Sequence, residues 1–140
     1  MAERKLNLRV VSPRTATDRR PYKLRKDSDL VILRCITGDL GILVGRMPCT
    51  MVLGSGILRS INDGKEYHMA IIGGVAHVSD DVVTVLTDTA LFPNEIDETD
   101  IRSQISDLQS KIDETSDLTI KNGLKSDLYD LKIQLEVAGK

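Results

Sequence analysis

Two histidines, His68 and His77, are the side chains in this sequence best suited to acid–base chemistry near neutral pH. Each lies in a run of β-forming residues, and neither has a serine, cysteine or carboxylate partner at the spacing of a catalytic motif. A structural or surface role is the better interpretation of both. Turn formation explains the carboxylates at the expected strand ends, which are Asp80, Asp81 and Asp88. The sequence therefore predicts a protein that is not itself an enzyme.

Cysteines and glycines are the other residues here that bind metals or phosphates in many proteins. Cys35 and Cys49 lie inside apolar runs and lack metal-ligand spacing, which indicates reduced, inert thiols. Gly38, Gly41 and Gly45 lie in GDLGILVG, which matches neither the Walker spacing nor the dinucleotide fingerprint and precedes no helical pattern. A turn in a β-domain explains these glycines better, so we expect no metal and no cofactor.

The composition excludes several functional classes. The 140 residues carry a net charge of −2, with 3% aromatic residues and no tryptophan. Nucleic-acid binding needs a basic field and aromatic stacking platforms, so no nucleic-acid partner is expected. No apolar run reaches about 18 residues. The N-terminal MAERKLNLRV lacks the apolar stretch of a secretory signal, so a cytoplasmic location is expected.

One local cluster of charge departs from this overall balance. It consists of Arg14, Arg19, Arg20, Lys23, Arg25 and Lys26. A solvated strand edge is the leading interpretation of such a cluster, and contact with an acidic protein or a membrane surface is the alternative.

Residues 1–90 predict an all-β sandwich or barrel. They read as short β-branched runs, such as LNLRVV, DLVILRCI, EYHMAII, VAHV and VVTVLT, separated by turn residues. The segment Asn62-Asp63-Gly64 predicts a tight hairpin, because Asp-Gly accommodates the positive φ values of a primed turn. Gly73-Gly74 and Ser79-Asp80-Asp81 are expected to separate further strands. Several strands at this spacing are typical of a sandwich or barrel.

Residues 91–140 instead predict an antiparallel α-helical hairpin. Asp97 or Thr99 can cap the first helix, and the polar stretch 114–117 separates it from the second. In both segments apolar residues recur at steps of four, three and four, which places each set along one helical stripe. The two stripes form the expected hairpin seam: Ile101, Ile105, Leu108, Ile112, Leu124, Leu128, Leu131 and Leu135. Because each stripe is narrow, we expect too little apolar surface for a large third partner, and a hairpin that is only marginally held.

Five segments in order carry a resemblance to a known family. They are VVSP (Val10 to Pro13), GDLGILVGRMP (Gly38 to Pro48), IIGGVAHV (Ile71 to Val78), VVTVLTDTA (Val82 to Ala90) and EID (Glu95 to Asp97). With the two-helix tail that follows, the chain resembles the epsilon subunit of bacterial F-type ATP synthases. The GDLGIL segment and the stretch from the glycine pair to DTA are the most specific.

The resemblance implies a non-catalytic rotor subunit of the central stalk. Its β-domain would bind the γ subunit and the ring of c subunits, and so couple ion-driven rotation to ATP synthesis. By the match, the c-ring-facing turn consists of Gly38, Asp39, Leu40 and Gly41. The γ-facing residues would be Arg46, Met47 and Pro48. The protein would then lie at the cytoplasmic face of the cell membrane, held there only through the complex.

The resemblance also implies a regulatory tail. In this family the tail folds down as a hairpin or extends along γ into the catalytic head, where it restrains ATP hydrolysis. In the extended form, Lys121, Lys125 and Lys132 would transiently meet an acidic segment of the β subunit. Acidic residues are interspersed among these lysines, so the electrostatic attraction is expected to be modest and salt-sensitive.

An ATP-binding sensor is the alternative function for the tail. Family members that bind ATP carry Ile-Asp-x-x-Arg-Ala at the start of the first helix, whereas this chain reads Ile96-Asp97-Glu98-Thr99-Asp100-Ile101-Arg102. The arginine is displaced by two residues, which rotates it by about 200° on a helix. The position of Arg102 therefore argues against a nucleotide site. A second departure replaces the usual proline and histidine of the GILPGH-like segment with Val44 and Arg46.

Overall fold

The computed structural model describes residues 4–12 and 23–138, which form a β-sandwich followed by two helices. Its strands are β1 (Leu6–Val11), β2 (Leu24–Ser28), β3 (Leu30–Cys35), β4 (Gly38–Leu43), β5 (Cys49–Asn62), β6 (Lys65–Ser79), β7 (Val82–Leu86) and β8 (Ala90–Leu91). A short 3-10 helix, η1 (Pro93–Glu95), leads to α1 (Glu98–Glu114) and α2 (Leu118–Ala138). This order confirms the predicted fold class.

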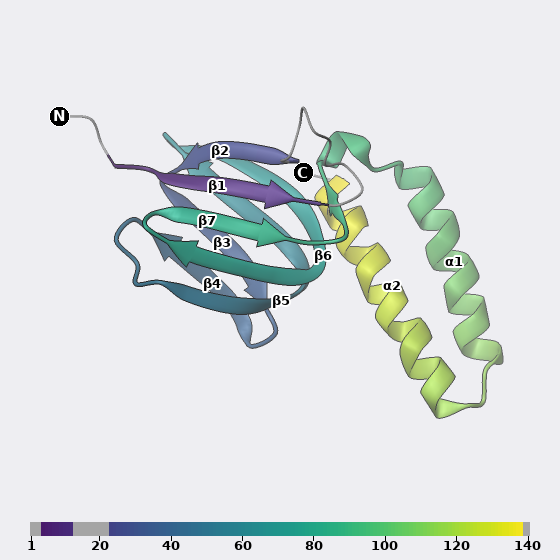
Figure 1. Cartoon of the computed structure of the whole chain (residues 1–140). Coiled ribbons are helices and arrows are strands. Elements are labelled where there is room, and N and C mark those ends of the chain that lie inside the picture. The colour runs from purple at the N-terminus through teal and green to yellow at the C-terminus, as the bar shows by residue number, and fades with distance from the viewer. Residues whose placement is uncertain (1–3, 13–22, 139–140) are drawn as a thin grey trace.

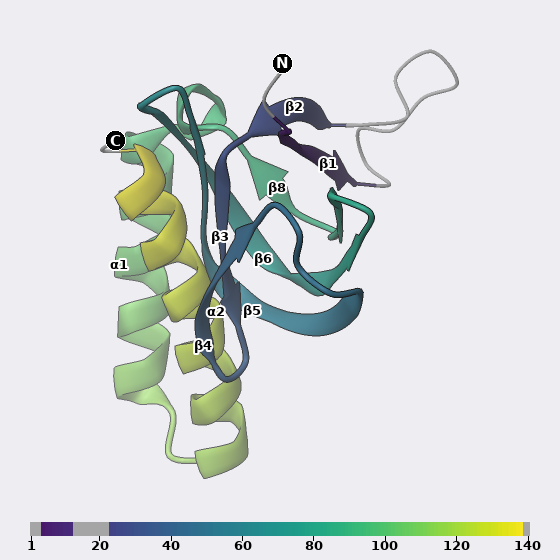
Figure 2. The ribbon, with the colours of Figure 1, turned by 90° about the vertical axis from the view of Figure 1, so that its left-hand side faces the viewer.

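The strands form one sheet that folds over into two layers. Its order is β2-β1-β7-β6-β5-β3-β4, and β8 pairs with β6. The long strands β5 and β6 pair with each other along almost their whole length. Near its C-terminal end β6 also pairs with β7, and β3 pairs with the C-terminal part of β5. In Figure 2, β3, β5 and β6 therefore stand on the helix side, while β1 and β2 lie on the far side.

Two tight turns match the sequence prediction. Asp63 and Gly64, with φ of 50° and 78°, join β5 to β6, and Asp80 and Asp81, with φ of 51° and 62°, join β6 to β7. Aspartate tolerates the left-handed region better than most residues, and glycine enters it freely. Both hairpins are therefore specified locally.

The break predicted at Gly73 and Gly74 is wrong, because β6 runs through both glycines. Their φ values of 71° and 128° bend the strand without ending it. At Gly74 a side chain is also excluded on steric grounds, since a Cβ atom would lie 2.2 Å from the carbonyl oxygen of Leu86. The glycine pair thus allows one strand to pass through the bend.

The sandwich encloses an apolar core to which seven strands, all except β2, contribute buried apolar residues. In β1, for example, Leu6, Leu8 and Val10 are fully buried and alternate with partly exposed residues. The larger set of buried residues includes Val31, Leu33, Ile42, Leu58, Met69, Val78, Val83 and Val85. Burial of this apolar surface supplies the main driving force for folding of the β-domain.

The two helices form the predicted antiparallel hairpin. Asp97 accepts hydrogen bonds from the backbone N–H groups of Thr99 and Asp100, and so caps α1. Asp117 caps α2 in the same way through the N–H groups of Thr119 and Ile120. Each carboxylate satisfies amides that have no partner inside the helix.

Only α2 of the hairpin makes extensive contact with the sheet, through β5 and β6. Figures 1 and 2 show α2 beside the sheet and α1 on its outer side. The buried residues Ile133 and Val137 of α2 pack with Ala70 and with Ile57, Ile72, Leu91 and Ile96. The hairpin therefore meets the sheet through a small apolar cluster, which the seam pattern alone does not predict. One turn apart, Ile133 and Val137 form a second apolar face beside the leucine stripe. In the described part of the chain, neither helix is long and apolar enough to cross a membrane.

Candidate functional site

The residues predicted to form a c-ring-facing turn lie in a strand instead. Gly38, Asp39, Leu40 and Gly41 belong to β4, and Cys35 pairs directly with Gly38. The turn therefore consists of Ile36 and Thr37, and the positive φ of 127° at Gly38 completes it. Ile36 is 70% exposed at the tip of this hairpin. The tip thus presents an apolar side chain beside the charged pair of Asp39 and Arg34, whose Oδ1 and Nη1 atoms are 3.3 Å apart.

The predicted γ-facing residues, Arg46, Met47 and Pro48, lie exposed in the loop between β4 and β5. Asp81, in the turn between β6 and β7, anchors the start of this loop. Its Oδ1 atom accepts a hydrogen bond from the backbone N–H of Gly45 at 2.8 Å, and its Oδ2 atom is 2.5 Å from Nη2 of Arg4. The Gly45 amide and then Arg4 lower the pKa of Asp81, because both stabilise the ionised carboxylate.

Loop anchoring by Asp81 should consequently depend on pH. Because the pKa of Asp81 is lowered in the folded state, its contribution is present above the ordinary carboxyl pKa and is lost as the pH falls through the lowered value. Replacing Asp81 with Asn should remove this titration and loosen residues 44–48. The measurement is the amide chemical shift of Gly45 across an acid titration. A Gly45 shift that titrates identically in the Asp81→Asn protein would contradict the assignment.

An apolar row crosses the outer face of the sandwich on the side away from α2. Val52 of β5 pairs with Val75 of β6, and Val75 pairs with Leu86 of β7. All three side chains are exposed, Val52 and Leu86 by more than half. Val11 extends the row on β1, since it pairs with Leu86. In Figure 1 the strands that carry this face lie at the front of the sandwich, and neither helix crosses them.

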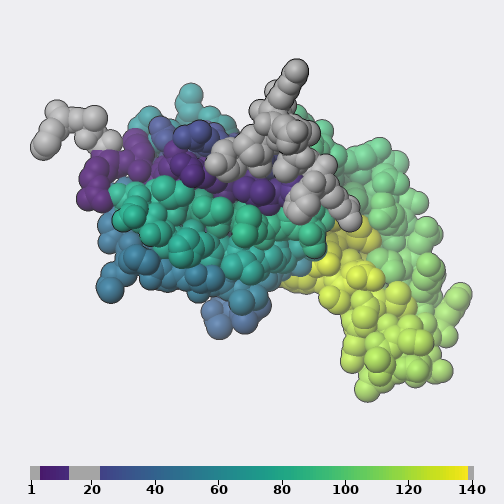
Figure 3. Space-filling model, viewed as in Figure 1, coloured from purple at the N-terminus to yellow at the C-terminus, as the bar shows by residue number. Residues whose placement is uncertain are grey.

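The surroundings of this row are polar. His77 Nδ1 and Thr50 Oγ1 lie 2.9 Å apart on the neighbouring cross-strand pair. In the space-filling view of Figure 3, β7 and the adjoining strands form a broad surface beside the helices. The sequence alone does not reveal the row, because the row depends on the register of three strands. The local signal was VVTVL, in which apolar residues occupy both faces of β7.

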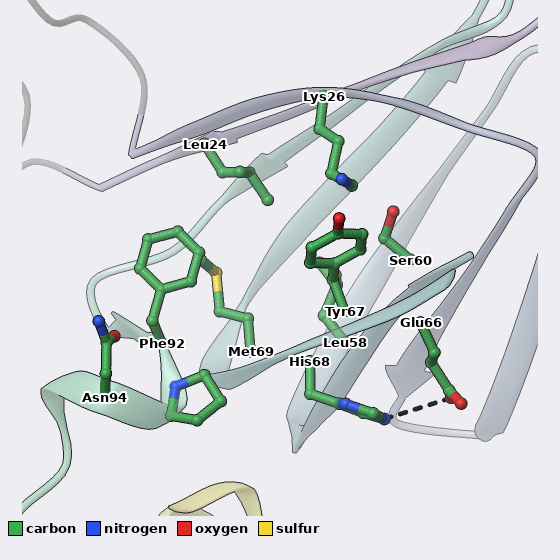
Figure 4. A pocket seen from close by; sticks show the side chains of 11 residues that line it. Leu24, Lys26, Leu58, Ser60, Glu66, Tyr67, His68, Met69, Phe92 and Asn94 are labelled. Atoms are coloured by element: carbon green, nitrogen blue, oxygen red, sulfur yellow. Dashed lines mark ion pairs between the residues drawn. The ribbon is translucent and has the colours of Figure 1, made fainter. Parts of the chain in front are cut away.

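A second apolar region is a cavity of about 540 Å³ between β2 and the first half of β6 (Figure 4). Leu24, Leu58, Met69 and Phe92 supply most of its apolar lining. The Lys26 ammonium group lies 3.3 Å from the centre of the Tyr67 ring. It therefore stands over an aromatic face, a favourable position for a cation.

The polar groups of this cavity are paired in ways that do not produce a nucleophile. His68 Nε2 lies 3.2 Å from Glu66 Oε1, as the dashed line in Figure 4 marks. Ser60 Oγ is 2.5 Å from Ser28 Oγ, so its hydrogen-bond partner is another hydroxyl group. Nucleophilic catalysis requires a base within hydrogen-bond reach of the nucleophile, and these pairs do not provide it.

The described residues also give little support for metal binding or for a reactive thiol. Across residues 4–12 and 23–138, no group of three His, Cys, Asp or Glu side chains is placed to hold a metal ion. Cys35 is buried and free, and burial raises the pKa of its thiol. A raised pKa keeps the thiol protonated and unreactive at neutral pH.

The basic cluster divides between described and undescribed residues. Arg14, Arg19 and Arg20 lie outside the residues that the structure describes. Lys23 is paired with Glu95, with Nζ and Oε2 2.6 Å apart, and so links the start of β2 to η1. Together with Lys26 over Tyr67, this gives two of the cluster's lysines structural contacts.

The predicted seam residues lie along the facing sides of α1 and α2. Ile101, Ile112 and Leu128 are buried, and the partly buried members are Ile105, Leu108, Leu124, Leu131 and Leu135. On α2, Lys125 and Lys132 are exposed and Lys121 is partly so. At the tip of the hairpin Leu118 and Ile120 are exposed by more than half. Arg102 is also exposed, on α1.

Comparisons with known proteins agree with this architecture. A model of the ATP synthase delta/epsilon chain β-sandwich domain matches residues 5–93, which end before α1. The ATP synthase epsilon chain of Synechococcus sp. is 33% identical over 113 residues, covering 80% of this chain and 77% of that relative. The epsilon chain of Caldicellulosiruptor bescii is 38% identical over 69 residues, covering half of its own length.

One solved structure is similar to this chain throughout. It is a chain in the mitochondrial ATP synthase of Euglena gracilis, in an assembly of OSCP, F1 and c ring. The TM-score is 0.78 at 24% identity, and the match covers 100% of this chain and 84% of that one. The likeness therefore includes the fold of the helical hairpin as well as that of the sandwich.

Proposed function

Because the chain belongs to the ATP synthase delta/epsilon family, we propose that it couples rotation of a c ring to ATP synthesis as part of the central stalk. Members of this family are accessory subunits of ATP synthase, and the catalytic sites lie on other subunits. The sandwich would bind the γ subunit and the c ring, and the helices would regulate hydrolysis. Attachment to the cytoplasmic face of the cell membrane would then occur only through the complex.

The observation that carries this proposal is the uncovered apolar row of Val52, Val75 and Leu86. The hairpin packs on Ile57, Ala70 and Ile72 of β5 and β6. Val52, Val75 and Leu86 lie outside this contact and are exposed. Exposed apolar rows surrounded by polar groups are typical of protein–protein contacts. A stiff sheet also keeps such a contact in fixed geometry during rotation. We assign this face to γ.

The two loop regions complete the proposed contacts. Ile36 and Asp39, at the end of the β3–β4 hairpin, would meet the polar loops of the c ring. The anchored loop with Arg46, Met47 and Pro48 would extend the contact with γ. Met47 is 81% exposed, which leaves its flexible side chain free to pack on a partner.

The test of the γ assignment is co-elution with a γ-containing catalytic subcomplex. Replacing Val75 and Leu86 together with Asp should weaken binding by about tenfold or more, because charges would occupy the centre of an apolar contact. Far-ultraviolet circular dichroism should remain unchanged, since both side chains point outward. The control for two added charges is Leu118→Asp with Ile120→Asp, at exposed apolar positions on the hairpin tip. Equal binding of both variants would overturn the assignment.

For the tail, we propose restraint of ATP hydrolysis by an extended form. The supporting observation is that α1 packs against α2, and that α2 meets the sheet through a small apolar cluster. Opening would therefore expose limited surface, which contacts elsewhere can replace. Lys121, Lys125 and Lys132 would then meet the β subunit. The alternative role as an ATP sensor would be favoured by ATP binding to the isolated chain.

A further inference from the structure

The open side of the sandwich holds a cavity of about 540 Å³ that none of the proposed contacts uses. Within the described part of the chain, β2 pairs with β1 alone, and residues 65–69 of β6 pair with β5 alone. The two sheet layers are therefore not joined by backbone hydrogen bonds at this place. Figure 4 shows the resulting space between β2 and β6, bordered on one side by residues 92–94.

The apolar lining of this cavity follows from strand geometry and pairing. Side chains two residues apart on a strand share a face, so Leu24 and Lys26 both line the cavity from β2. On the opposite wall, Leu58 of β5 pairs with Met69 of β6. Both are buried members of the main core, and Phe92 packs against that core. The apolar part of a ligand placed here would therefore be shielded from water in the same way as a core side chain.

The charged groups around the cavity leave one cation, Lys26, without an acidic partner. Its ammonium group lies 3.3 Å from the centre of the Tyr67 ring, and it forms no ion pair among the residues that the structure describes. Glu66 is paired instead with Arg59 and with His68. Because Lys26 is partly buried, its charge is less screened by water and attracts an anion more strongly. The cavity thus combines an apolar interior with a positive charge at its edge.

We propose that this cavity binds one amphiphilic carboxylate, with its hydrocarbon chain between β2 and β6 and its carboxylate at the Lys26 ammonium group. A single cation matches a head group of one negative charge, whereas a phosphate dianion needs more donors than this edge supplies. Ser60, a buried hydroxyl in the same wall, already bonds to Ser28. The volume of about 540 Å³ lies within the range of small-molecule sites, about 300–1,000 Å³.

This site is separate from the contacts proposed for γ and the c ring. Neither the row of Val52, Val75 and Leu86 nor the β3–β4 hairpin lines the cavity. Residues 92–94, which lead from β8 toward α1, do line it. A bound carboxylate therefore contacts both the sandwich and the start of the tail, and stabilises the arrangement in which they meet. The inference goes beyond the proposed function and does not depend on it.

The test is a nuclear magnetic resonance titration of the isolated full-length chain with sodium octanoate, below the concentration at which it forms micelles. Saturable shifts are expected for the methyl groups of Leu24, Leu58 and Met69. Lys26→Gln should weaken octanoate binding by about tenfold, through loss of one charged hydrogen bond, and should leave binding of uncharged octanol unchanged. Lys65→Gln is the matched control, because it removes an exposed lysine of β6 that does not line the cavity.

A second variant tests the apolar wall. Leu24→Gln should weaken the binding of octanoate and of octanol alike, because both chains would lie against this side chain. Undiminished binding of both ligands by the Leu24→Gln protein would refute the site.

Three further results would contradict the proposal. One is the absence of saturable shifts at the cavity methyl groups. Another is a set of shifts centred on Val52, Val75 and Leu86, which would show that the amphiphile adsorbs to the exposed apolar row instead. The third is an equal loss of octanoate affinity in the Lys26→Gln and Lys65→Gln proteins, which would show that overall charge, and not Lys26, attracts the carboxylate.

Discussion

Replacing Gly74 with Ala should destabilise the β-domain by about 3 kcal/mol or more, the largest effect we expect from a single methyl group. Gly74 has a φ of 128°, a region that residues with side chains rarely occupy. The added Cβ would also lie 2.2 Å from the carbonyl oxygen of Leu86. The opposing atom belongs to the backbone of β7, so a change of rotamer cannot relieve the clash.

Urea unfolding followed by circular dichroism measures this loss, and Gly73→Ala is the matched control. Gly73 has a φ of 71°, but a Cβ atom there would meet nothing within 4 Å. Its replacement should cost only the conformational penalty of about 1–2 kcal/mol. Similar losses of unfolding free energy in the two proteins would show that the backbone at Leu86 shifts readily to admit a Cβ atom. That result would contradict our account of the bend.

Replacing Val137 with Asp should detach α2 from the sheet while leaving the sandwich folded. Val137 is fully buried against Ala70, which is itself fully buried. Burying an unpaired carboxylate at this position costs several kcal/mol, which is more than the small apolar cluster contributes to the docking of α2. The helix would therefore move into solvent rather than bury the charge. The main core lies between the sheet layers and does not include this position.

Hydrogen exchange should show loss of protection in α2, with β1, β6 and β7 unchanged. Burial raises the pKa of a carboxyl group, so acidification should favour the neutral form and partly restore docking of α2. Asn122→Asp, at an exposed position of the same helix, is the control for added charge alone. If the tail regulates hydrolysis as we propose, its detachment should restrain hydrolysis more strongly in the assembled enzyme. Full protection of α2 in the Val137→Asp protein would refute the assigned role of this cluster.

Locally determined features of the fold were predictable from sequence. Asp63-Gly64 and Asp80-Asp81 adopt the positive φ values that their residue types favour, and Asp97 caps α1 as expected. The two helices follow from the spacing of their apolar residues. Each of these features depends on residues a few positions apart, so short patterns carry enough information to specify them.

Features that depend on distant residues were not predictable in the same way. The pair Gly73-Gly74 predicts a break, because the sequence does not show that Leu86 lies against it. The resemblance places residues 38–41 in a turn, although pairing with β3 places the turn at Ile36 and Thr37. The contact role of Ile133 and Val137 on α2 is also not visible in the sequence, because they pack against Ala70, which is distant along the chain.

The candidate contact surface shows the same division. Arg46 and Met47 lie in an exposed loop, which agrees with a role in binding. The row of Val52, Val75 and Leu86 could not be found from one strand, because three strands contribute one residue each. Neighbours in space therefore determine the surface, whereas neighbours in sequence determine the turns and helices.

The position of β1 sets an order of events during synthesis of the chain on the ribosome. This strand pairs with β2 on one side and with the much later β7, in parallel, on the other. Such long-range pairing is slow to form, since a long loop must close first. The hairpins of β3 to β6 can form while β1 still has one free edge, and the sandwich closes only after Leu86 has emerged. The helices emerge after the strands, so α2 meets a sheet surface whose strands are already in place.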